Sequence, residues 1–181
     1  MEMMNNWNAV VIINGSGGCG KSEFIKQCRY SKILPVYEFS SVDYVKEVAK
    51  FCGWSGKKDV SDRMFLYNLK MALEKWDDSP TTSVLDAIEN TIDGKTDNLF
   101  FVNIREIYNI VRFKLLIQEK LHIPCYDLLV KNKNVPVIKD SIPDAGTELH
   151  EYDFYINNDG DINELAEKAK EFIKRIYPYA E

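Results

Sequence analysis

The sequence predicts an α/β fold: a five-stranded parallel sheet with helices on both faces, in three layers. Two observations support this prediction. Five short apolar segments alternate with amphipathic helical segments along the 181 residues, which is typical of parallel strands joined by right-handed crossovers. The first apolar segment runs directly into a glycine-rich loop and a helix. We see no internal repeat, low-complexity tract or interdomain linker, so we expect residues 1–181 to form a single domain.

The composition is that of an ordinary globular protein. Apolar residues make up 45% and charged residues 28% of the chain, which is enough for one α/β domain with a filled core. The formal net charge of −5 gives no general attraction to nucleic acid or to an anionic membrane, and we expect neither as a partner. The amino-terminal residues lack the pattern of a secretory signal. Because the four cysteines show no metal-ligand spacing, we interpret them as reduced thiols of a cytoplasmic protein.

A buried strand leading into a glycine-rich loop is the first functional segment. Residues 9–14 form a β-branched apolar run that ends in an asparagine, as expected of a strand buried on both faces. The next eight residues match the P-loop pattern G-x-x-x-x-G-K-[ST]: Gly15, Ser16, Gly17, Gly18, Cys19, Gly20, Lys21 and Ser22. A flexible turn without a ligand is the alternative, but the strand before the motif and the helix after it favour a phosphate site.

The residue types of this loop suit the phosphates of a nucleotide. Glycines allow backbone angles at which successive N–H groups point at phosphate oxygens, and the positive end of the following helix favours the same anion. Lys21 would then reach the β- and γ-phosphates, and the Ser22 hydroxyl would bind Mg²⁺.

The next elements are a helix over about 19–30 and a short strand over 35–39. A serine at 40 or 41 is expected to cap a second helix, with Asp43 in its first turn and its end at Gly53. Its apolar face would be formed by Val42, Val45, Val48, Ala49 and Cys52.

A third helix is expected to begin at Ser61 or Asp62, and a fourth begins at Pro80 and ends at Asp93-Gly94. The buried face of the third would consist of Leu66, Leu69, Leu73 and Trp76. Another face of the same helix groups Arg63, Tyr67 and Lys70. That face is either a solvated basic surface or a site for a charged acceptor.

A strand over 99–102 ends next to Asn103 and Arg105, and a helix with Ile107, Ile110 and Leu115 follows. Because ligands bind at the carboxyl ends of parallel strands, Arg105 would lie at the same edge as the P-loop. Its alternative role is a surface salt bridge.

The remaining segments before the last helix are a strand over 123–130, a lysine-bearing loop over 131–150, a strand over 152–156 and a turn over 157–160. The last helix spans 162–176, with Asp161 and Glu164 as a capping box.

P-loop proteins include GTPases, motor-type ATPases and small-molecule kinases. A GTPase needs a guanine-reading N-K-x-D motif, but Asn132-Lys133-Asn134 is followed by Val135. A motor-type ATPase usually ends its second core strand in an acidic pair, and here Asn103 occupies that place. The short chain, Arg105 at a strand end and the cationic face around Arg63 favour a small-molecule kinase.

Several short motifs beyond the P-loop resemble one branch of the nucleoside monophosphate kinase-like family, the deoxynucleoside monophosphate and phosphomevalonate kinases. These motifs are Ser-Val-Asp-x-Val-Lys-Glu-Val-Ala at 41–49, Asp-Val-Ser-Asp-Arg at 59–63, Val-Asn-Ile-Arg-Glu at 102–106 and Tyr-Asp-Phe-Tyr-Ile-Asn-Asn-Asp-Gly at 152–160. The resemblance covers nearly the whole chain. It implies a P-loop kinase fold with ATP and Mg²⁺, a helical acceptor-binding region over 41–93 and a lid-like loop over 131–150.

The resemblance also implies roles for single residues. Asp43, Arg63 and Lys70 would belong to the acceptor region, and Arg105 would contact the acceptor phosphate or the transferring group. Asn157 and Gly160 would lie in the turn beside the donor base. The sequence departs from the family at Asn103, where an acid is common, and in the loop, which has no arginine; Lys131 is therefore the expected catalytic cation, with Lys133 and Lys139 near it.

The predicted function is phosphoryl transfer from ATP to a small phosphorylated acceptor, most simply a (deoxy)nucleoside monophosphate, catalysed by Lys21, Arg105 and Lys131. Asp43 would act as a base if the acceptor were a hydroxyl, and Asp43 or Glu106 would help Ser22 to position the metal. The alternatives are a phosphomevalonate kinase-like enzyme, a nucleotide-binding protein with little or no kinase activity, and a nucleoside triphosphatase acting on a macromolecule.

Overall fold

The computed structural model describes residues 6–57, 59–135 and 150–180. The chain forms two compact units: unit 1 comprises Met1–Glu38 and Ile92–Glu181, and unit 2 comprises Phe39–Thr91. The predicted fold class is confirmed, because five parallel strands form one sheet with flanking helices. Among the described helices, none is both long and apolar enough to cross a membrane.

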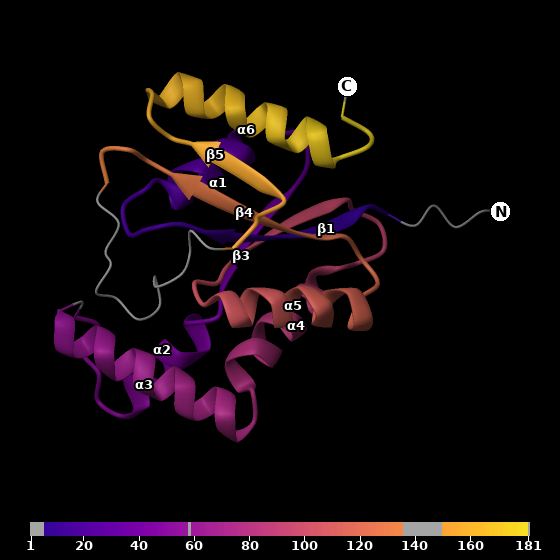
Figure 1. Cartoon of the computed structure of the whole chain (residues 1–181). Helices are drawn as coiled ribbons and strands as arrows, with labels where there is room; N and C mark the ends of the chain where they lie inside the picture. Colours follow the sequence, from indigo (N-terminus) through magenta and orange to yellow (C-terminus); the bar gives the residue numbers. More distant parts are fainter. Residues whose placement is uncertain (1–5, 58, 136–149, 181) are drawn as a thin grey trace. The chain divides into compact units, whose positions relative to one another are not determined.

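The first strand lies at the centre of the sheet. The strands are β1 (Asn8–Asn14), β2 (Val36–Ser40), β3 (Asn98–Asn103), β4 (Cys125–Lys131) and β5 (Phe154–Asn157), in the spatial order β2-β3-β1-β4-β5. β1 pairs in parallel with β3 and with β4 (Figure 1), and every residue of β1 is buried. The continuous apolar run therefore forms a central strand covered on both faces, as predicted.

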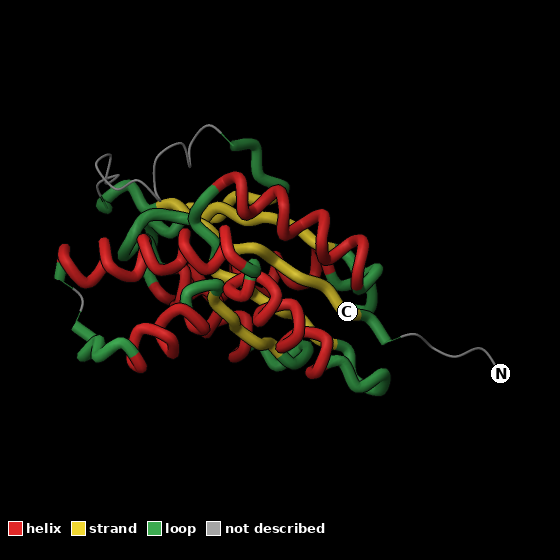
Figure 2. Tube along the Cα trace, turned by 90° about the horizontal axis from the view of Figure 1, so that it is seen from below, coloured by secondary structure: helices red, strands yellow, loops and turns green. Residues whose placement is uncertain are grey.

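Three helices cover this sheet in unit 1: α1 (Lys21–Tyr30), α5 (Ile107–Lys120) and α6 (Ile162–Ile176). α1 and α6 pack against each other, whereas α5 contacts β4 and β1. Figure 1 shows α6 and α5 on opposite sides of the strands, which are the yellow layer of Figure 2. Phe24 of α1, Phe101 of β3 and Phe172 of α6 meet in edge and tilted ring contacts that fill the core on the α1 side.

Unit 2 is formed by the three helices α2 (Asp43–Phe51), α3 (Val60–Trp76) and α4 (Ser79–Thr91), which contact one another. α3 begins one or two residues earlier than predicted, because the Asp59 carboxylate caps it by accepting from the Asp62 amide. The expected serine cap of α2 is wrong: Val42 holds the cap position, and Ser41 is buried. Trp76 was also placed wrongly, since 85% of it is exposed at the end of α3.

Two strands of unit 1 begin later than their apolar patterns suggested. β4 starts at Cys125, because Pro124 has no amide to donate; its carbonyl accepts from the Val10 amide at 2.9 Å. β5 starts at Phe154, because the Asp153 amide donates to the Asp127 side chain at 2.7 Å instead of to a strand. At the other end of β5 the predicted cap of α6 is confirmed: the Asp161 carboxylate accepts from the amides of Asn163 and Glu164.

Asp127 of β4 is an acid buried in the sheet, with 2% of its surface exposed. Its oxygens lie 2.9 Å from Nε2 of His150 and 3.5 Å from Nζ of Lys114, and it also accepts from the Asp153 amide. Burial by itself would raise the pKa of this carboxyl, but the Asp153 amide, His150 and Lys114 outweigh burial and hold the pKa below its usual range.

We expect Asp127→Asn to lower the free energy of unfolding at pH 7 by about 2 kcal/mol, because the buried carboxylate is lost as a charged partner of Lys114, which keeps only Asp153, and as a charged acceptor for the Asp153 amide. The pKa of Asp127 is lower in the folded than in the unfolded state, where it is about 3.9. The carboxylate therefore stabilises the fold above that pH, and this contribution is lost as the pH falls through the folded-state pKa. Urea unfolding between pH 7 and pH 3 should show a shallower acid decline for Asp127→Asn than for the exposed control Asp86→Asn; equal declines would contradict the assignment.

Candidate functional site

The P-loop leaves the carboxyl end of β1 and closes on the first turn of α1. Gly15 and Gly20 have φ values of +141° and +102°, which side chains rarely adopt. A Cβ at Gly15 would lie 2.3 Å from the Val130 carbonyl oxygen of β4, and one at Gly20 would lie 2.1 Å from Nδ2 of Asn158. The loop can therefore follow this path only with glycine at both ends.

The Lys21 side chain folds back over this loop. Its Nζ donates to the carbonyl oxygens of Gly15 at 2.5 Å and Ser16 at 3.0 Å. The ammonium group thus lies against the backbone of the loop, and its contact with phosphates stays a prediction. Ser22, in the first turn of α1, is exposed, so its hydroxyl is accessible to a metal that is also bound by phosphate oxygens.

Asn158, which is not among the predicted site residues, holds the loop from the β5–α6 turn. Its side-chain Nδ2 donates to the Cys19 carbonyl at 2.9 Å, and its backbone N–H donates to the Lys131 carbonyl at 2.7 Å. The available signal was its position between Asn157 and Gly160, both predicted to lie next to the donor. Gly160 is packed against Glu164, whose carboxylate occupies the space of a Cβ, and the Asn157 carbonyl accepts from Lys168 at 2.7 Å.

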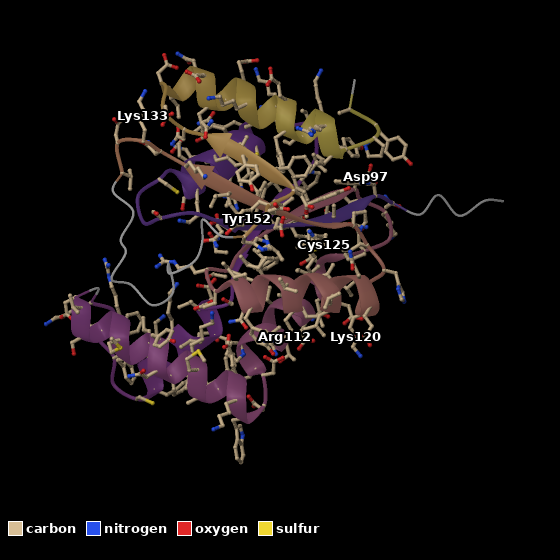
Figure 3. The ribbon with its side chains drawn as sticks, in the orientation of Figure 1. Asp97, Arg112, Lys120, Cys125, Lys133 and Tyr152 are labelled. Carbon is tan, nitrogen blue, oxygen red and sulfur yellow. The ribbon has the colours of Figure 1, made fainter. Side chains whose placement is uncertain are left out.

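Lys131 is the last residue of β4 and not the first of a loop. Its backbone pairs with Asn157, and its Nζ lies 5.5 Å from the centre of the Tyr155 ring. Lys133 follows in a turn (Figure 3), where its amide donates to the Asp159 carboxylate at 2.7 Å. Lys139 and most of the predicted lid-like loop lie outside the described residues.

The carboxyl end of β3 places two predicted residues near the P-loop. The Arg105 carbonyl accepts from the side chain of Asn14, the residue immediately before the loop, at 3.0 Å, and the Arg105 residue is exposed. Asn103 donates from its Nδ2 to the carboxylate of Glu38 on β2 at 3.0 Å. Glu38 also lies 3.5 Å from Arg29. The carboxylate next to Asn103 is therefore that of Glu38, which belongs to the neighbouring strand β2 and is already paired with Arg29.

The remaining predicted residues belong to unit 2. Asp43 is exposed and lies 2.8 Å from Lys46, and Arg63 is exposed on α3. Lys70 is only 3% exposed and lies 3.5 Å from Glu74, so the interpretation of its face as a solvated surface is wrong at this residue. These three residues stay predicted acceptor-binding residues.

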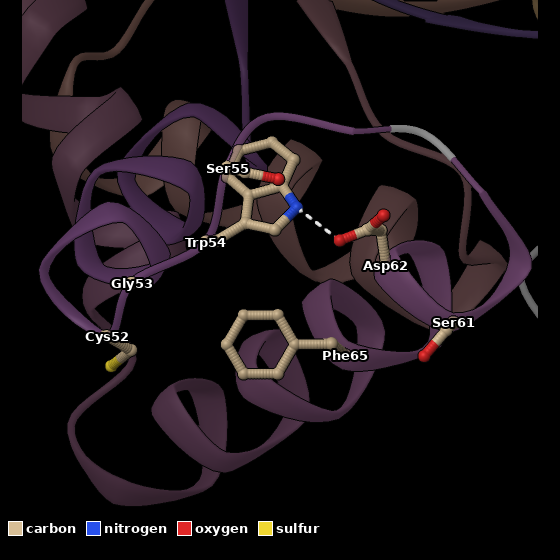
Figure 4. A pocket seen from close by; sticks show the side chains of 7 residues that line it. All are labelled: Cys52, Gly53, Trp54, Ser55, Ser61, Asp62 and Phe65. Atoms are coloured by element: carbon tan, nitrogen blue, oxygen red, sulfur yellow. Dashed lines mark hydrogen bonds between the residues drawn. The ribbon is translucent and has the colours of Figure 1, made fainter.

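Unit 2 also contains an open hollow at the junction of α2 and α3. Figure 4 shows the Trp54 and Phe65 rings at its sides, with the Trp54 indole donating to Asp62 at 2.8 Å. The other lining residues are Cys52, Gly53, Ser55 and Ser61.

Several solved structures share the fold of this chain. APS kinase from Mycobacterium tuberculosis in complex with AMPPNP and APS has a TM-score of 0.53 and 12% identity, covering 93% of this chain and 99% of that one. A putative kinase from Chloroflexus aurantiacus has a TM-score of 0.55 and 10% identity, with 95% and 98% covered. Shikimate kinase from Aquifex aeolicus has a TM-score of 0.52 and 12% identity, with 92% and 96% covered.

The chain therefore has the α/β fold of the P-loop kinases. At these identities the likeness concerns the fold alone. Comparison of the sequence with known protein families gives no match, and comparison with curated proteins gives none either.

Proposed function

We propose that this protein is an ATP-dependent kinase that phosphorylates a small molecule. The observation that carries the proposal is the geometry of the P-loop, in which glycines at positive φ, Lys21 and the start of α1 are arranged around one loop at the end of the central strand. Structures of the same fold include kinases, one of them in complex with AMPPNP.

In this proposal the chain acts mainly by positioning and by neutralising charge. The loop amides and Lys21 would hold the donor phosphates, and Arg105 would orient the acceptor or the transferring group. The bond between the γ-phosphorus and the β–γ bridging oxygen breaks, an acceptor oxygen bonds to the same phosphorus, and ADP leaves. Lys131 would supply positive charge from the end of β4, although lysine lacks the bidentate fork of arginine.

The residues present fit a magnesium ion that is bound mostly through the nucleotide. Mg²⁺ commonly binds to substrate phosphates and to one or two protein oxygens, and the exposed Ser22 hydroxyl supplies one such oxygen. When bound, the ion would neutralise charge on the phosphates.

A phosphorylated acceptor is the finer part of the proposal, and a (deoxy)nucleoside monophosphate is its simplest form. It is supported by the motifs at 41–49 and 59–63 and by the exposed cationic residue Arg63 near Tyr67 on α3. An acceptor phosphate is already anionic, so no general base is needed. Asp43 is the proposed base only for a hydroxyl acceptor.

A coupled assay of ADP release, with ATP, Mg²⁺ and a panel of nucleoside monophosphates and phosphomevalonate, tests this proposal. We expect one class of acceptor to stimulate ADP release. In a thermal-shift screen with a non-hydrolysable ATP analogue, the same acceptor at about 100 times its dissociation constant should add about 2.7 kcal/mol of stability. ADP release that needs a protein or nucleic acid in place of a small acceptor would contradict the proposal.

The second candidate is a nucleotide-binding protein without useful kinase activity. It is favoured by one observation: Asn103 stands where an acid is common, and its amide is turned toward Glu38. ATP binding without acceptor-stimulated ADP release would support this candidate.

A further inference from the structure

The side chain of Asn14 lies at the junction of three segments of unit 1. Only 1% of the residue is exposed, and a buried amide is costly unless its polar atoms are paired. Here they are paired: Oδ1 accepts from the Gly15 amide at 2.7 Å, and Nδ2 donates to the Arg105 carbonyl and to the Tyr152 hydroxyl, each at 3.0 Å. One side chain thus connects the start of the P-loop, the turn after β3 and the segment before β5.

These partners allow only one orientation of the amide. The Gly15 N–H can only donate and the Arg105 carbonyl can only accept, so Oδ1 must face the loop and Nδ2 the turn. The Tyr152 hydroxyl (Figure 3) is compatible with this orientation, because a phenol can accept as well as donate and here it accepts from Nδ2. A leucine of similar size would leave the buried amide of Gly15 and the Arg105 carbonyl without this partner.

We propose that Asn14 is a positioning residue, which sets the place of Arg105 relative to the P-loop. The inference rests on the proposed function, in which the loop holds the donor phosphates and Arg105 contacts the acceptor or the transferring group. A displacement of about 1 Å between such groups can cost about 10²-fold in rate. The side-chain amide of Asn14 is hydrogen-bonded to the backbone of the P-loop and to the backbone of the turn after β3. It would limit that displacement without contacting either substrate.

Asn14→Asp tests the inference, because it keeps the acceptor for the Gly15 amide and removes the donor to the Arg105 carbonyl. The matched control is Tyr152→Phe, which removes another hydrogen bond of the same amide and leaves the Arg105 bond in place. Triple-resonance NMR reads the carbonyl resonance of Arg105 and the amide resonance of Gly15 in each variant. Steady-state kinetics and calorimetry with ADP give kcat, the acceptor KM and the nucleotide affinity.

We expect Asn14→Asp to shift the Arg105 carbonyl resonance more than Tyr152→Phe does, with the Gly15 amide resonance nearly unchanged. We also expect kcat to fall by about 10²-fold in Asn14→Asp and in the neutral Asn14→Ser, so that the effect of the lost Arg105 bond is separated from the effect of the added negative charge, which alone would weaken ADP binding. Serine is too short to reach Arg105, and Asn14→Ser replaces Asn14→Asp if that variant does not fold.

Two results would overturn the inference. The first is an Arg105 carbonyl resonance that shifts no more in Asn14→Asp than in Tyr152→Phe. The second is an unchanged kcat in an active variant that has lost the hydrogen bond between Asn14 and the Arg105 carbonyl. If the wild-type chain released no ADP with any acceptor, the proposed function would fail. The NMR comparison would still decide whether Asn14 fixes the turn.

Discussion

Lys21→Met is expected to reduce acceptor-stimulated ADP release by about 10³-fold while the fold stays intact. Nζ of Lys21 lies at the loop, where it donates to the carbonyl oxygens of Gly15 and Ser16, so methionine would remove the positive charge at the proposed phosphate site. Removing one preorganised donor from a site that stabilises developing charge commonly costs 10²–10³-fold, and Lys21 also carries a full charge. Methionine has similar length and flexibility, which should preserve the packing.

The matched control is Lys26→Met on the same helix. Lys26 is exposed and lies 3.4 Å from Glu23, the usual geometry of a surface ion pair of little energetic value. Turnover of this control should stay near the wild-type value, and circular dichroism should show the same helix content in both variants. Full turnover in Lys21→Met would mean that the donor site is assigned wrongly.

Gly15→Ala is expected to lower the free energy of unfolding by about 2–5 kcal/mol, the combined cost of overpacking and of a side chain at positive φ. The new Cβ would lie 2.3 Å from the Val130 carbonyl oxygen and 2.7 Å from Sγ of Cys19. Cys19 could turn aside, but Val130 belongs to β4, which is bonded to strands on both sides. The backbone of the sheet would have to shift.

Gly17→Ala is the control for this prediction, because a Cβ at Gly17 would meet no atom within 4 Å. Thermal and urea unfolding of the two variants measure the difference. For a chain of this size each kcal/mol corresponds to about 2–4 °C in Tm, so the variants should differ by roughly 10 °C. Equal stability would show that the start of the P-loop is not held against β4 as the structure has it.

The sequence predicted the fold because its strongest patterns are local. β1 reads as a buried strand from its own residues, the glycine-rich loop follows it as the motif predicts, and Asp161 starts α6 as its position suggested. The helices of unit 2 were less readable. Trp76 fits the apolar period of α3, yet the helix ends there and the ring is exposed. Periodicity assigns a face, but it does not show where the packing neighbours stop.

The polar contacts that hold the site could not be predicted, since they join residues far apart in the chain. Asn158 reaches Cys19, and Asn103 meets Glu38 on a neighbouring strand. Lys70 belongs to a face that the sequence allowed to be solvated, and no partner was predicted for Asp127, whereas both residues are buried beside opposite charges. Such pairs depend on strand order and on the direction of each side chain, and neither has a local signature.

The place of β1 in the sheet has a consequence for synthesis of the chain. Asn8 pairs with Asn98, 90 residues later in the chain, and β4 is made later still. At about 5–20 residues per second, roughly 5–20 s pass before the ribosome delivers the first neighbouring strand. Throughout that time the most apolar segment of the nascent chain has both edges open to other chains, although it is the segment on which the P-loop is built.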